Sequence, residues 1–259
     1  IEVTRLKQSI RTLYTNIDCI TNKKPEYFAI ISECSPDVIV TTETNPKNQR
    51  FRMTKTELHI PGYTLFTNAE EEGKRGVSIH VKDALQPTEV NKLKLTEFCE
   101  TIPVEVKLNG GDKLLILGVY RSPNSSKENN AMLNKLIQNS TTLGYSHLLF
   151  VGDFNYPEIK WNDQGGTTQS STNEAGKFLE AVCDSYLCQH VTFNTRFQIN
   201  QESNILDLIL TNEENMVSNL EAKAPVGKSD HIVITFDYNC YTQETFKENK
   251  GKKGEITYK

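Results

Sequence analysis

The stretch that decides the fold is Leu148-Leu-Phe-Val-Gly-Asp-Phe-Asn-Tyr-Pro157. Its four consecutive apolar residues, 148–151, predict a buried strand that Gly152 is expected to end. Asp153 and Asn155 follow directly, and alternate residues of an extended chain project to the same side. Both side chains can therefore face one pocket at the carboxyl end of the strand, where layered α/β proteins often place a site. The alternative is an Asx-turn, in which both side chains bond only to their own backbone.

The composition is ordinary for a globular protein, with 37% hydrophobic and 24% charged residues. A length of 259 residues fits one large domain or two small ones. No apolar run approaches the ~20 residues that a membrane span needs, so we expect no membrane partner. The net charge of −4 argues weakly against a general electrostatic nucleic-acid binder, but it leaves room for a local basic surface.

The ends of the chain predict how it is organised. Residues 1–240 are expected to form one domain, and the Lys-rich residues 241–259 a mobile tail or linker toward a downstream domain. The first residue is Ile1 rather than Met, and its surroundings do not resemble a signal peptide, so we expect a piece of a longer protein. Six scattered cysteines without metal-site spacing predict reduced, mostly buried thiols of an intracellular protein.

Strand patterns outnumber helix patterns along the chain. Strands are predicted at 11–16, 37–43, 63–66, 76–81, 102–108, 113–120, 148–151, 204–210 and 232–236. Helices are predicted at 23–34, from the capping-box pair Ser125 and Glu128 to residue 143, and from the pair Ser171 and Glu174 to residue 186. This ratio favours sheets packed face to face with helices outside, rather than a doubly wound parallel sheet.

Polar side chains recur where the predicted strands end: Asn16, Glu43, Tyr120, Asp153, Asn155, Asp230 and His231. Asp207 instead lies in the middle of an apolar strand, where a charge is costly unless it is paired. Carboxylates and amides suit a hard cation such as Mg²⁺. Phosphodiester hydrolysis needs a metal to neutralise charge and a base to activate water. The buried Asp207 is explained if it orients His231 and favours its charged form.

Each of these residues also has a purely structural interpretation. Glu43 can be a solvated strand end, and Tyr120 a core aromatic with a satisfied hydroxyl. His231 can be an ordinary histidine, which is what we expect of His59, His80, His147 and His190. The repeated position of the polar residues at strand ends favours a common site.

Six blocks along the chain resemble, in the same order, the endonuclease/exonuclease/phosphatase superfamily. They are Asn16, Thr-Glu43-Thr, Val-Tyr120-Arg-Ser-Pro, Gly-Asp153-Phe-Asn155, Leu-Asp207-Leu and Ser-Asp230-His231. Longer phrases are similar to the apurinic-type endonuclease domains of LINE-type (non-LTR) retrotransposons. These phrases are Leu13-Tyr-Thr-Asn, Val119-Tyr-Arg-Ser-Pro-Asn-Ser-Ser, Gly152-Asp-Phe-Asn-Tyr-Pro-Glu-Ile, Ile205-Leu-Asp-Leu-Ile-Leu-Thr-Asn and Gly227-Lys-Ser-Asp-His. The resemblance covers residues 10–240.

The resemblance implies a four-layered α/β sandwich, in which two mainly antiparallel sheets are packed together and flanked by helices, as in DNase I-like proteins. It implies a nuclease dependent on Mg²⁺, or on Mn²⁺, that nicks one strand of double-stranded DNA and leaves a 3′-hydroxyl. That hydroxyl would prime reverse transcription of the element's RNA by a downstream reverse transcriptase domain of the same polyprotein. The expected location is intracellular, and nuclear during action.

The resemblance also implies roles for single residues. Glu43 resembles the metal ligand, with Asn16 beside it, and Asp230 would help to place the metal or the histidine. Asp153 would align or deprotonate the attacking water, and Asn155 would hold a phosphate oxygen.

The remaining roles concern the transition state and the substrate. His231, oriented by Asp207, would stabilise the phosphorane-like transition state, and Tyr120 would support the phosphate. Arg121, Asn204 and Ser229 are expected either to contact the phosphate of the substrate or to support the site residues from behind.

Two departures from the family pattern stand near these blocks. Residues 74–77 carry one glycine where a pair is expected, and we interpret this as a change of turn that touches no catalytic block. Asn45 follows Thr44 where relatives often have a bulky aromatic residue, so the contacts beside the metal site are open. Target choice is expected to rest on the loops 45–58 and 192–203.

Two other functions fit the same pattern. One keeps the fold and the metal but acts on a phosphoinositide, sphingomyelin or RNA ends. The other is a domesticated DNA-binding module that keeps the site without using it. The acidic pI of about 5.8 gives the second some weight, although it also fits a nuclease that depends on neighbouring domains for affinity.

Overall fold

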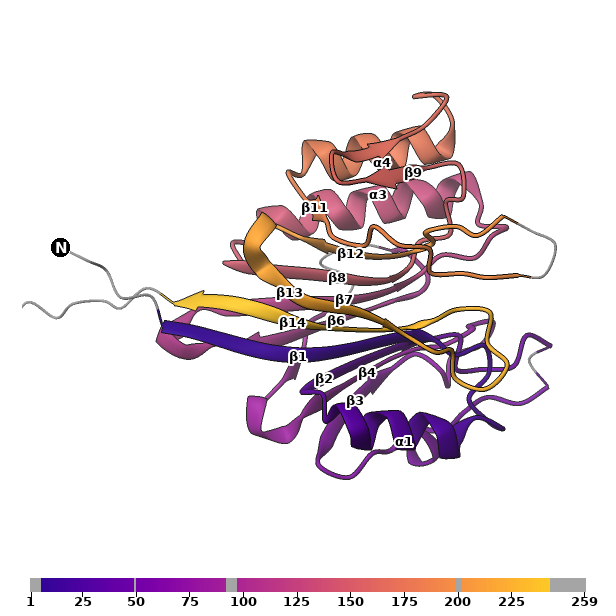
Figure 1. Cartoon of the computed structure of the whole chain (residues 1–259), viewed down its shortest axis with the longest axis vertical. Helices are drawn as coiled ribbons and strands as arrows, with labels where there is room; N and C mark the ends of the chain where they lie inside the picture. The colour runs from indigo at the N-terminus through magenta and orange to yellow at the C-terminus, as the bar shows by residue number, and fades with distance from the viewer. Residues whose placement is uncertain (1–5, 49, 92–96, 199–201, 243–259) are drawn as a thin grey trace, which may run out of the picture.

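Two six-stranded sheets pack face to face, and helices cover their outer faces (Figure 1). The computed structural model describes residues 6–48, 50–91, 97–198 and 202–242. From one outer surface to the other, the layers are helices α3 and α4, the two sheets, and helix α1 (Figure 1). The predicted four-layered α/β sandwich is confirmed.

The first sheet contains the chain's first and last described strands side by side. Its strand order is β13 (Val217–Lys223), β14 (Val233–Thr242), β1 (Leu6–Asn16), β2 (Val38–Thr42), β4 (Val77–Lys82) and β3 (Tyr63–Thr67). All neighbours are antiparallel except β1 and β2, which run parallel and end together at Asn16 opposite Thr42.

The second sheet repeats this design with one parallel pair at its centre. Its strand order is β11 (Cys188–Gln189), β12 (Asp207–Thr211), β8 (His147–Asp153), β7 (Lys113–Tyr120), β6 (Thr101–Lys107) and β5 (Thr88–Glu89). The parallel strands β7 and β8 end together at Tyr120 opposite Asp153, and antiparallel β12 begins at Asp207, also opposite Asp153. The carboxyl ends of both parallel pairs therefore deliver polar residues to one edge of each sheet.

Three longer helices and several short elements complete the fold. The longer helices are α1 (Lys24–Cys34), α3 (Lys127–Thr142) and α4 (Glu174–Asp184), and α2 (Lys55–Leu58) is a single turn. Short 3₁₀ turns are η1 (Asp83–Leu85), η3 (Asn109–Gly111) and η4 (Glu214–Met216), and β9 (Lys160–Asn162) pairs with β10 (Gly165–Thr167). The predicted helix starts were wrong by one or two positions. The caps are Ser126, which accepts from the Asn129 N–H, and Asn173, which accepts from the Gly176 N–H.

The central strand β8 shows why a continuous apolar run was needed. Leu149 and Val151 face the core between the two sheets, whereas Leu148 and Phe150 face the core beneath α3 and α4. A strand covered on both faces has no polar side, so its sequence cannot alternate. A third core packs α1 against the outer face of the first sheet.

Gly152 does not end β8, as the sequence had suggested, because the strand continues to Asp153. A side chain at Gly152 would place its Cβ 1.9 Å from the carbonyl oxygen of Val119, so the glycine permits close approach of β7. Asp207 is the first residue of β12 rather than the middle of a strand.

The cysteines and the C-terminal segment differ from what the sequence predicts. All six cysteines are free thiols, but only Cys240 is buried, so the prediction of mostly buried thiols was wrong. The predicted tail at 241–259 begins inside β14, which runs to Thr242, and residues 243–259 lie outside the described residues. The single domain over 1–240 stays a prediction. Within the described ranges, no helix has the length and apolar character to cross a membrane.

The buried His80 in β4 predicts a loss of stability in acid. Its Nε2 lies 2.7 Å from the carbonyl oxygen of Leu58, and burial lowers the pKa of His80 to about 4. The unfolded chain, with an ordinary histidine pKa, binds an extra proton below pH 6.5, so the folded state loses stability from pH 6.5 down to 4. We expect His80→Gln to remove about 3 kcal/mol of the fall in unfolding free energy between pH 7 and pH 4, measured by urea unfolding.

The matched control is the exposed neighbour His59, which makes the smallest of the contributions to the shift of the His80 pKa, so its change to Gln should retain most of the parent protein's pH dependence. An unaltered pH dependence in His80→Gln would contradict the assignment.

Candidate active site

A polar pocket of about 490 Å³ opens where the carboxyl ends of β1, β2, β7 and β8 meet. It is lined by seven of the residues singled out in the sequence: Asn16, Glu43, Tyr120, Asp153, Asn155, Asp230 and His231. Asp207 lies directly behind the pocket, where it contacts His231. The structure therefore brings together residues that are up to 215 positions apart, from Asn16 to His231.

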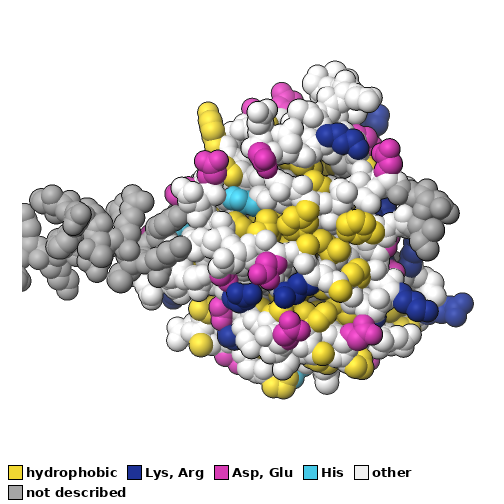
Figure 2. Space-filling view, in the orientation of Figure 1, with side chains coloured by type: hydrophobic (Ala, Val, Ile, Leu, Met, Phe, Trp, Pro, Cys, Tyr) yellow, Lys and Arg dark blue, Asp and Glu magenta, His cyan; other side chains and the backbone are white. Residues whose placement is uncertain are grey.

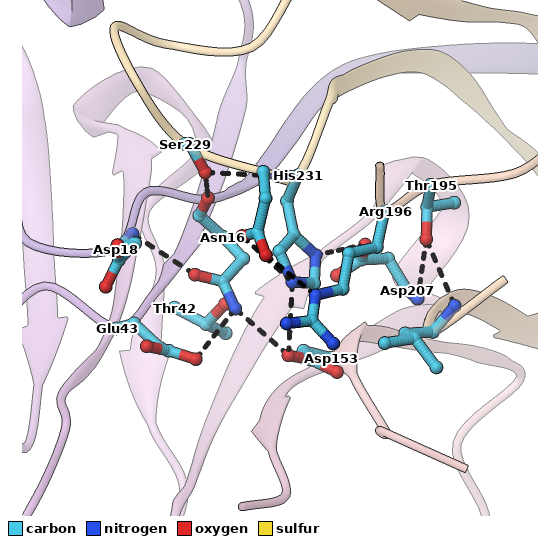
Figure 3. A network of polar contacts seen from close by, with 12 residues as sticks. Asn16, Asp18, Thr42, Glu43, Asp153, Thr195, Arg196, Asp207, Ser229 and His231 are labelled. Atoms are coloured by element: carbon cyan, nitrogen blue, oxygen red, sulfur yellow. Dashed lines mark hydrogen bonds and ion pairs between the residues drawn. The ribbon is translucent and has the colours of Figure 1, made fainter. Parts of the chain in front are cut away.

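His231 is held by a carboxylate from the other sheet (Figure 3). Its Nδ1 lies 2.7 Å from Asp207 Oδ2, and the hydroxyl of Tyr14 donates to Asp207 Oδ1 at 2.6 Å. Thr195 joins the two segments, because its Oγ1 accepts from the Asp207 N–H and its carbonyl oxygen accepts from the Ile232 N–H. With Nδ1 committed to Asp207, the Nε2 of His231 is the atom that meets the pocket.

The carboxylates around His231 keep it charged. Burial alone would lower its pKa, but the charge of Asp207 and its hydrogen bond, with smaller contributions from Asp153 and Asp230, raise the pKa of His231 to about 10. The imidazole is therefore protonated at neutral pH and offers an Nε2–H donor. This nitrogen lies 3.9 Å from one oxygen each of Asp153 and Asp230.

Asp153 is a fully buried carboxylate with one oxygen unused. Its Oδ2 accepts from Asn16 Nδ2 at 3.0 Å, whereas its Oδ1 has no hydrogen-bond partner among the described residues. Burial, with help from the charges of Asp207 and Glu43, raises the pKa of Asp153, although the nearby His231 opposes this. A carboxylate with a raised pKa binds a proton more readily, which suits a general base.

Asn16 arranges the two carboxylates beside it. Its Nδ2 donates to Glu43 Oε1 and to Asp153 Oδ2, both at 3.0 Å, and its Oδ1 accepts from the Asp18 N–H at 3.2 Å (Figure 3). The amide nitrogen, rather than the oxygen, therefore faces the carboxylates. This geometry gives Asn16 a positioning role for both carboxylates, and its predicted role beside a metal stays a prediction.

Three residues of the pocket have strained backbones. Glu43 has a φ of 55°, Asn155 a φ of 51° and Asp18 a φ of 42°, in the left-handed region that is unfavourable for residues with a side chain. Arg121 holds the second of these, because its guanidinium donates to the Asn155 carbonyl oxygen at 2.6 Å. Strain of this kind persists only where the surroundings enforce it, and it often marks functional sites.

Arg75 is a pocket residue that the sequence interpretation missed. Its guanidinium pairs with Glu43 and, at 3.0 Å, with Asp18 Oδ1, so the expectation that residues 74–77 touch no catalytic block was wrong. Gly76 has a φ of 89°, and a Cβ there would lie 2.2 Å from Thr44 Oγ1, so this single glycine makes the turn possible. The buried side chain of Asn45 bonds to backbone groups at 53, 69 and 74, which is a structural role.

Three predicted substrate contacts do not line the pocket. Arg121 donates to Asn130 and stacks 3.9 Å above the ring centroid of Tyr156. The hydroxyl of Ser229 donates to the Asn16 carbonyl oxygen and accepts from the His231 N–H. Asn204 donates its side-chain amide to the backbone of Glu202. The first two therefore support pocket residues from behind, and the Asn204 side chain bonds within its own loop.

The pocket is also lined by an arginine–aspartate ion pair and by two lysines. Asp230 accepts from Arg196 Nε at 2.8 Å, and Lys47 and Lys228 also line the pocket. Asp230 therefore contacts Arg196 through Oδ2 and lies beside the His231 ring through Oδ1. The sequence signal for these residues was weak, because single Lys and Arg residues in loops are common. Asp18 could have been found from its position two residues after Asn16.

The pocket has the chemistry of a site for a hard divalent cation. Glu43 and Asp18 supply carboxylates beside each other on Arg75, and Asp153 Oδ1 supplies an unpartnered oxygen among the described residues. A second acidic group, Asp153 with Asp207 and His231, has ligand atoms within 4.8 Å of one another. Both Asp207 oxygens and the His231 Nδ1 are already hydrogen-bonded, so we interpret that group as a hydrogen-bond relay.

Comparison with known proteins identifies the fold. A family model described as endonuclease-reverse transcriptase matches residues 114–235, which include β7, β8 and β12. This segment is similar to that family, and the fold of the whole chain is shared with solved structures of nucleases and phosphatases. None of the curated proteins matches the sequence.

Solved structures of two endonucleases and a phosphatase are similar to this chain in fold at low sequence identity. The endonuclease domain of TRAS1, a telomere-specific non-LTR retrotransposon, is 16% identical with a TM-score of 0.66, covering 89% of this chain and 98% of that one. The AP endonuclease LMAP from Leishmania major is 12% identical with a TM-score of 0.66, covering 90% and 88%. The 3′ phosphatase NExo from Neisseria, bound to a product DNA hairpin, is 16% identical with a TM-score of 0.64, covering 88% and 99%.

Removing the Tyr14 hydroxyl should destabilise the protein more than removing an equally buried neutral hydrogen bond. Tyr14→Phe leaves the buried Asp207 Oδ1 without its 2.6 Å donor, and we expect a loss of about 2 kcal/mol in unfolding free energy. The control is Tyr27→Phe, because the Tyr27 side chain is equally buried and its hydroxyl shares a 2.7 Å hydrogen bond with the neutral Thr41 hydroxyl, the one partner it has in the described part of the chain. Equal losses in urea unfolding would show that the Tyr14–Asp207 bond has no special weight.

Proposed function

We propose that this chain is a DNA endonuclease, dependent on Mg²⁺ or Mn²⁺, that nicks one strand and leaves a 3′-hydroxyl. The observation that carries the proposal is the convergence of three different groups on one pocket. These are a carboxylate with a raised pKa, Asp153, an imidazolium donor, His231, and the cation-binding carboxylate Glu43.

The geometry supports a division of labour in hydrolysis. Asp153 Oδ1 accepts a proton from the attacking water, and its raised pKa favours this. The Nε2–H of His231 and the side-chain amide of Asn155 donate to phosphate oxygens, where negative charge grows in the transition state. Tyr120, whose pKa is raised first by burial and then by Glu43 and Asp153, stays protonated and is a further donor.

A divalent cation would be held by Glu43, with Asp18 beside it, and would supply charge neutralisation at the phosphate and the leaving oxygen. Water adds to phosphorus, the bond from phosphorus to the 3′ oxygen breaks, and the products are a 5′-phosphate and a 3′-hydroxyl. Asn16 keeps Glu43 and Asp153 in place throughout, through its two 3.0 Å hydrogen bonds.

The proposed DNA contacts are local. Figure 2 shows acidic and basic side chains interspersed on the face it displays, without one broad basic patch. Lys47, Lys228 and Arg196 line the pocket and are placed to contact phosphates on either side of the scissile one. Phe51 and Phe197, which are 48% and 51% exposed, lie in the two loops expected to choose the target.

We further propose the place of this activity in a non-LTR retrotransposon. Support comes from the matched family description, which joins an endonuclease to a reverse transcriptase, and from the fold of the TRAS1 domain. The 3′-hydroxyl would prime reverse transcription by a downstream domain of the same polyprotein, which requires action on nuclear DNA.

Nicking of supercoiled plasmid tests the proposed function. We expect open-circular product with Mg²⁺ and none with EDTA. His231→Ala removes the donor to the transition state and should lower the rate by about 10²–10³-fold. The control is the exposed His59, whose change to Ala should leave the rate as in the parent protein.

Folded parent protein that fails to nick DNA with either Mg²⁺ or Mn²⁺ would overturn the proposal. Hydrolysis of small phosphoesters without nicking would then favour a phosphatase. DNA binding without any turnover would favour a binding module.

A further inference from the structure

A permanent cation is built into the candidate metal site. The side chain of Arg75 is only 10% exposed, and its guanidinium contacts Glu43 Oε2, Asp18 Oδ1 at 3.0 Å and the Asn45 carbonyl oxygen at 2.6 Å. Glu100 fixes the backbone beneath it, because its carboxylate accepts from the N–H groups of Arg75 at 2.9 Å and of Gly76 at 3.1 Å. These contacts hold both the backbone and the guanidinium of Arg75 in place at the pocket.

Both oxygens of Glu43 are already engaged by the protein. Oε1 accepts from Asn16 at 3.0 Å, and Oε2 accepts from Arg75. A divalent cation that binds Glu43 must share or replace the guanidinium contact, and the two positive charges repel each other at short range. Arginine cannot relieve this repulsion by losing its proton.

We propose that Arg75 weakens divalent-cation binding at Glu43 and thereby couples that binding to the arrival of the phosphate. The proposal rests on the proposed function for the identity of the metal site. A phosphodiester adds negative charge between the two cations, so it offsets their repulsion. Metal and DNA should therefore each raise the affinity for the other.

A second arginine in the same pocket provides a matched control. Arg196 also lines the pocket and also pairs with an aspartate, Asp230, at 2.8 Å. Its partner lies beside His231, and no contact of Arg196 with Glu43 is present among the described residues. Replacing either arginine by methionine removes the same charge, but only Arg75→Met frees Glu43.

The test is calorimetric titration of the DNA-free protein with Mn²⁺. We expect Arg75→Met to bind Mn²⁺ at least about tenfold more tightly than the parent protein, by removal of a close positive charge. Arg196→Met should stay within about threefold. Unchanged or weaker binding in Arg75→Met, or equal tightening in both variants, would overturn the proposal.

A second measurement uses the parent protein, so it does not depend on the folding of a variant. The Nε–H signal of Arg75, assigned by its loss in Arg75→Lys, should shift when Mg²⁺ is added, whereas that of Arg196 should not. An Arg75 signal that does not move while Mg²⁺ binds would overturn the competition.

Glu43→Gln in the same titrations separates the two proposals. If it abolishes Mn²⁺ binding while Arg75→Met has no effect, the metal site stands and the role of Arg75 falls. If it leaves Mn²⁺ binding intact, Glu43 is not the metal ligand, and both this inference and the proposed mechanism fall.

Discussion

The hydrogen bond between Asp207 and His231 joins the two sheets at the point where the pocket forms. Asp207 begins β12 of one sheet, and His231 stands just before β14 of the other. A fully buried carboxylate is costly unless it is paired, and here Tyr14 and His231 each take one of its oxygens. Both partners come from the side of the first sheet, so the buried Asp207 carboxylate is stabilised only when the two sheets are packed together. Neither sheet alone could make the site.

The strand directions supply the rest of the pocket. In each sheet the single parallel pair ends at the same edge, so Asn16 and Glu43 arrive from one sheet, and Tyr120 and Asp153 from the other. Just past two of these strands, Glu43 and Asn155 adopt left-handed backbones. The regular hydrogen-bonded strands are rigid enough to hold such local strain, and the strained residues turn their side chains into the pocket.

The sequence was sufficient for the features that depend on local patterns. The excess of strand patterns over helix patterns predicted the layered fold, and the polar residues at strand ends predicted seven of the residues that line the pocket. The cost of burying Asp207 predicted its pairing with His231. Features that arise from long-range packing were out of reach. Tyr14 looks like an ordinary core aromatic, and Arg75 like a loop cation, until the fold brings Asp207 and Glu43 against them.

Other differences have local physical causes. Serine and asparagine are both good N-cap residues, so a stretch with several of them offers more than one possible helix start. The helices begin after Ser126 and Asn173, rather than after the predicted Ser125 and Ser171. A glycine usually interrupts a strand, which is why Gly152 predicts a strand end. In the folded chain the carbonyl oxygen of Val119 lies so close that no side chain fits at this position. The orientation of the Asn16 amide follows from the two carboxylates around it, which only the folded chain reveals.

In the proposed reaction, this pocket breaks the bond between phosphorus and the 3′ oxygen of DNA. The most direct test is to give DNA nicked by this chain to a DNA polymerase with labelled nucleotides. We predict incorporation at the nick without any prior treatment of the ends, because the cut leaves a free 3′-hydroxyl. Incorporation that requires removal of a 3′-phosphate first would contradict it.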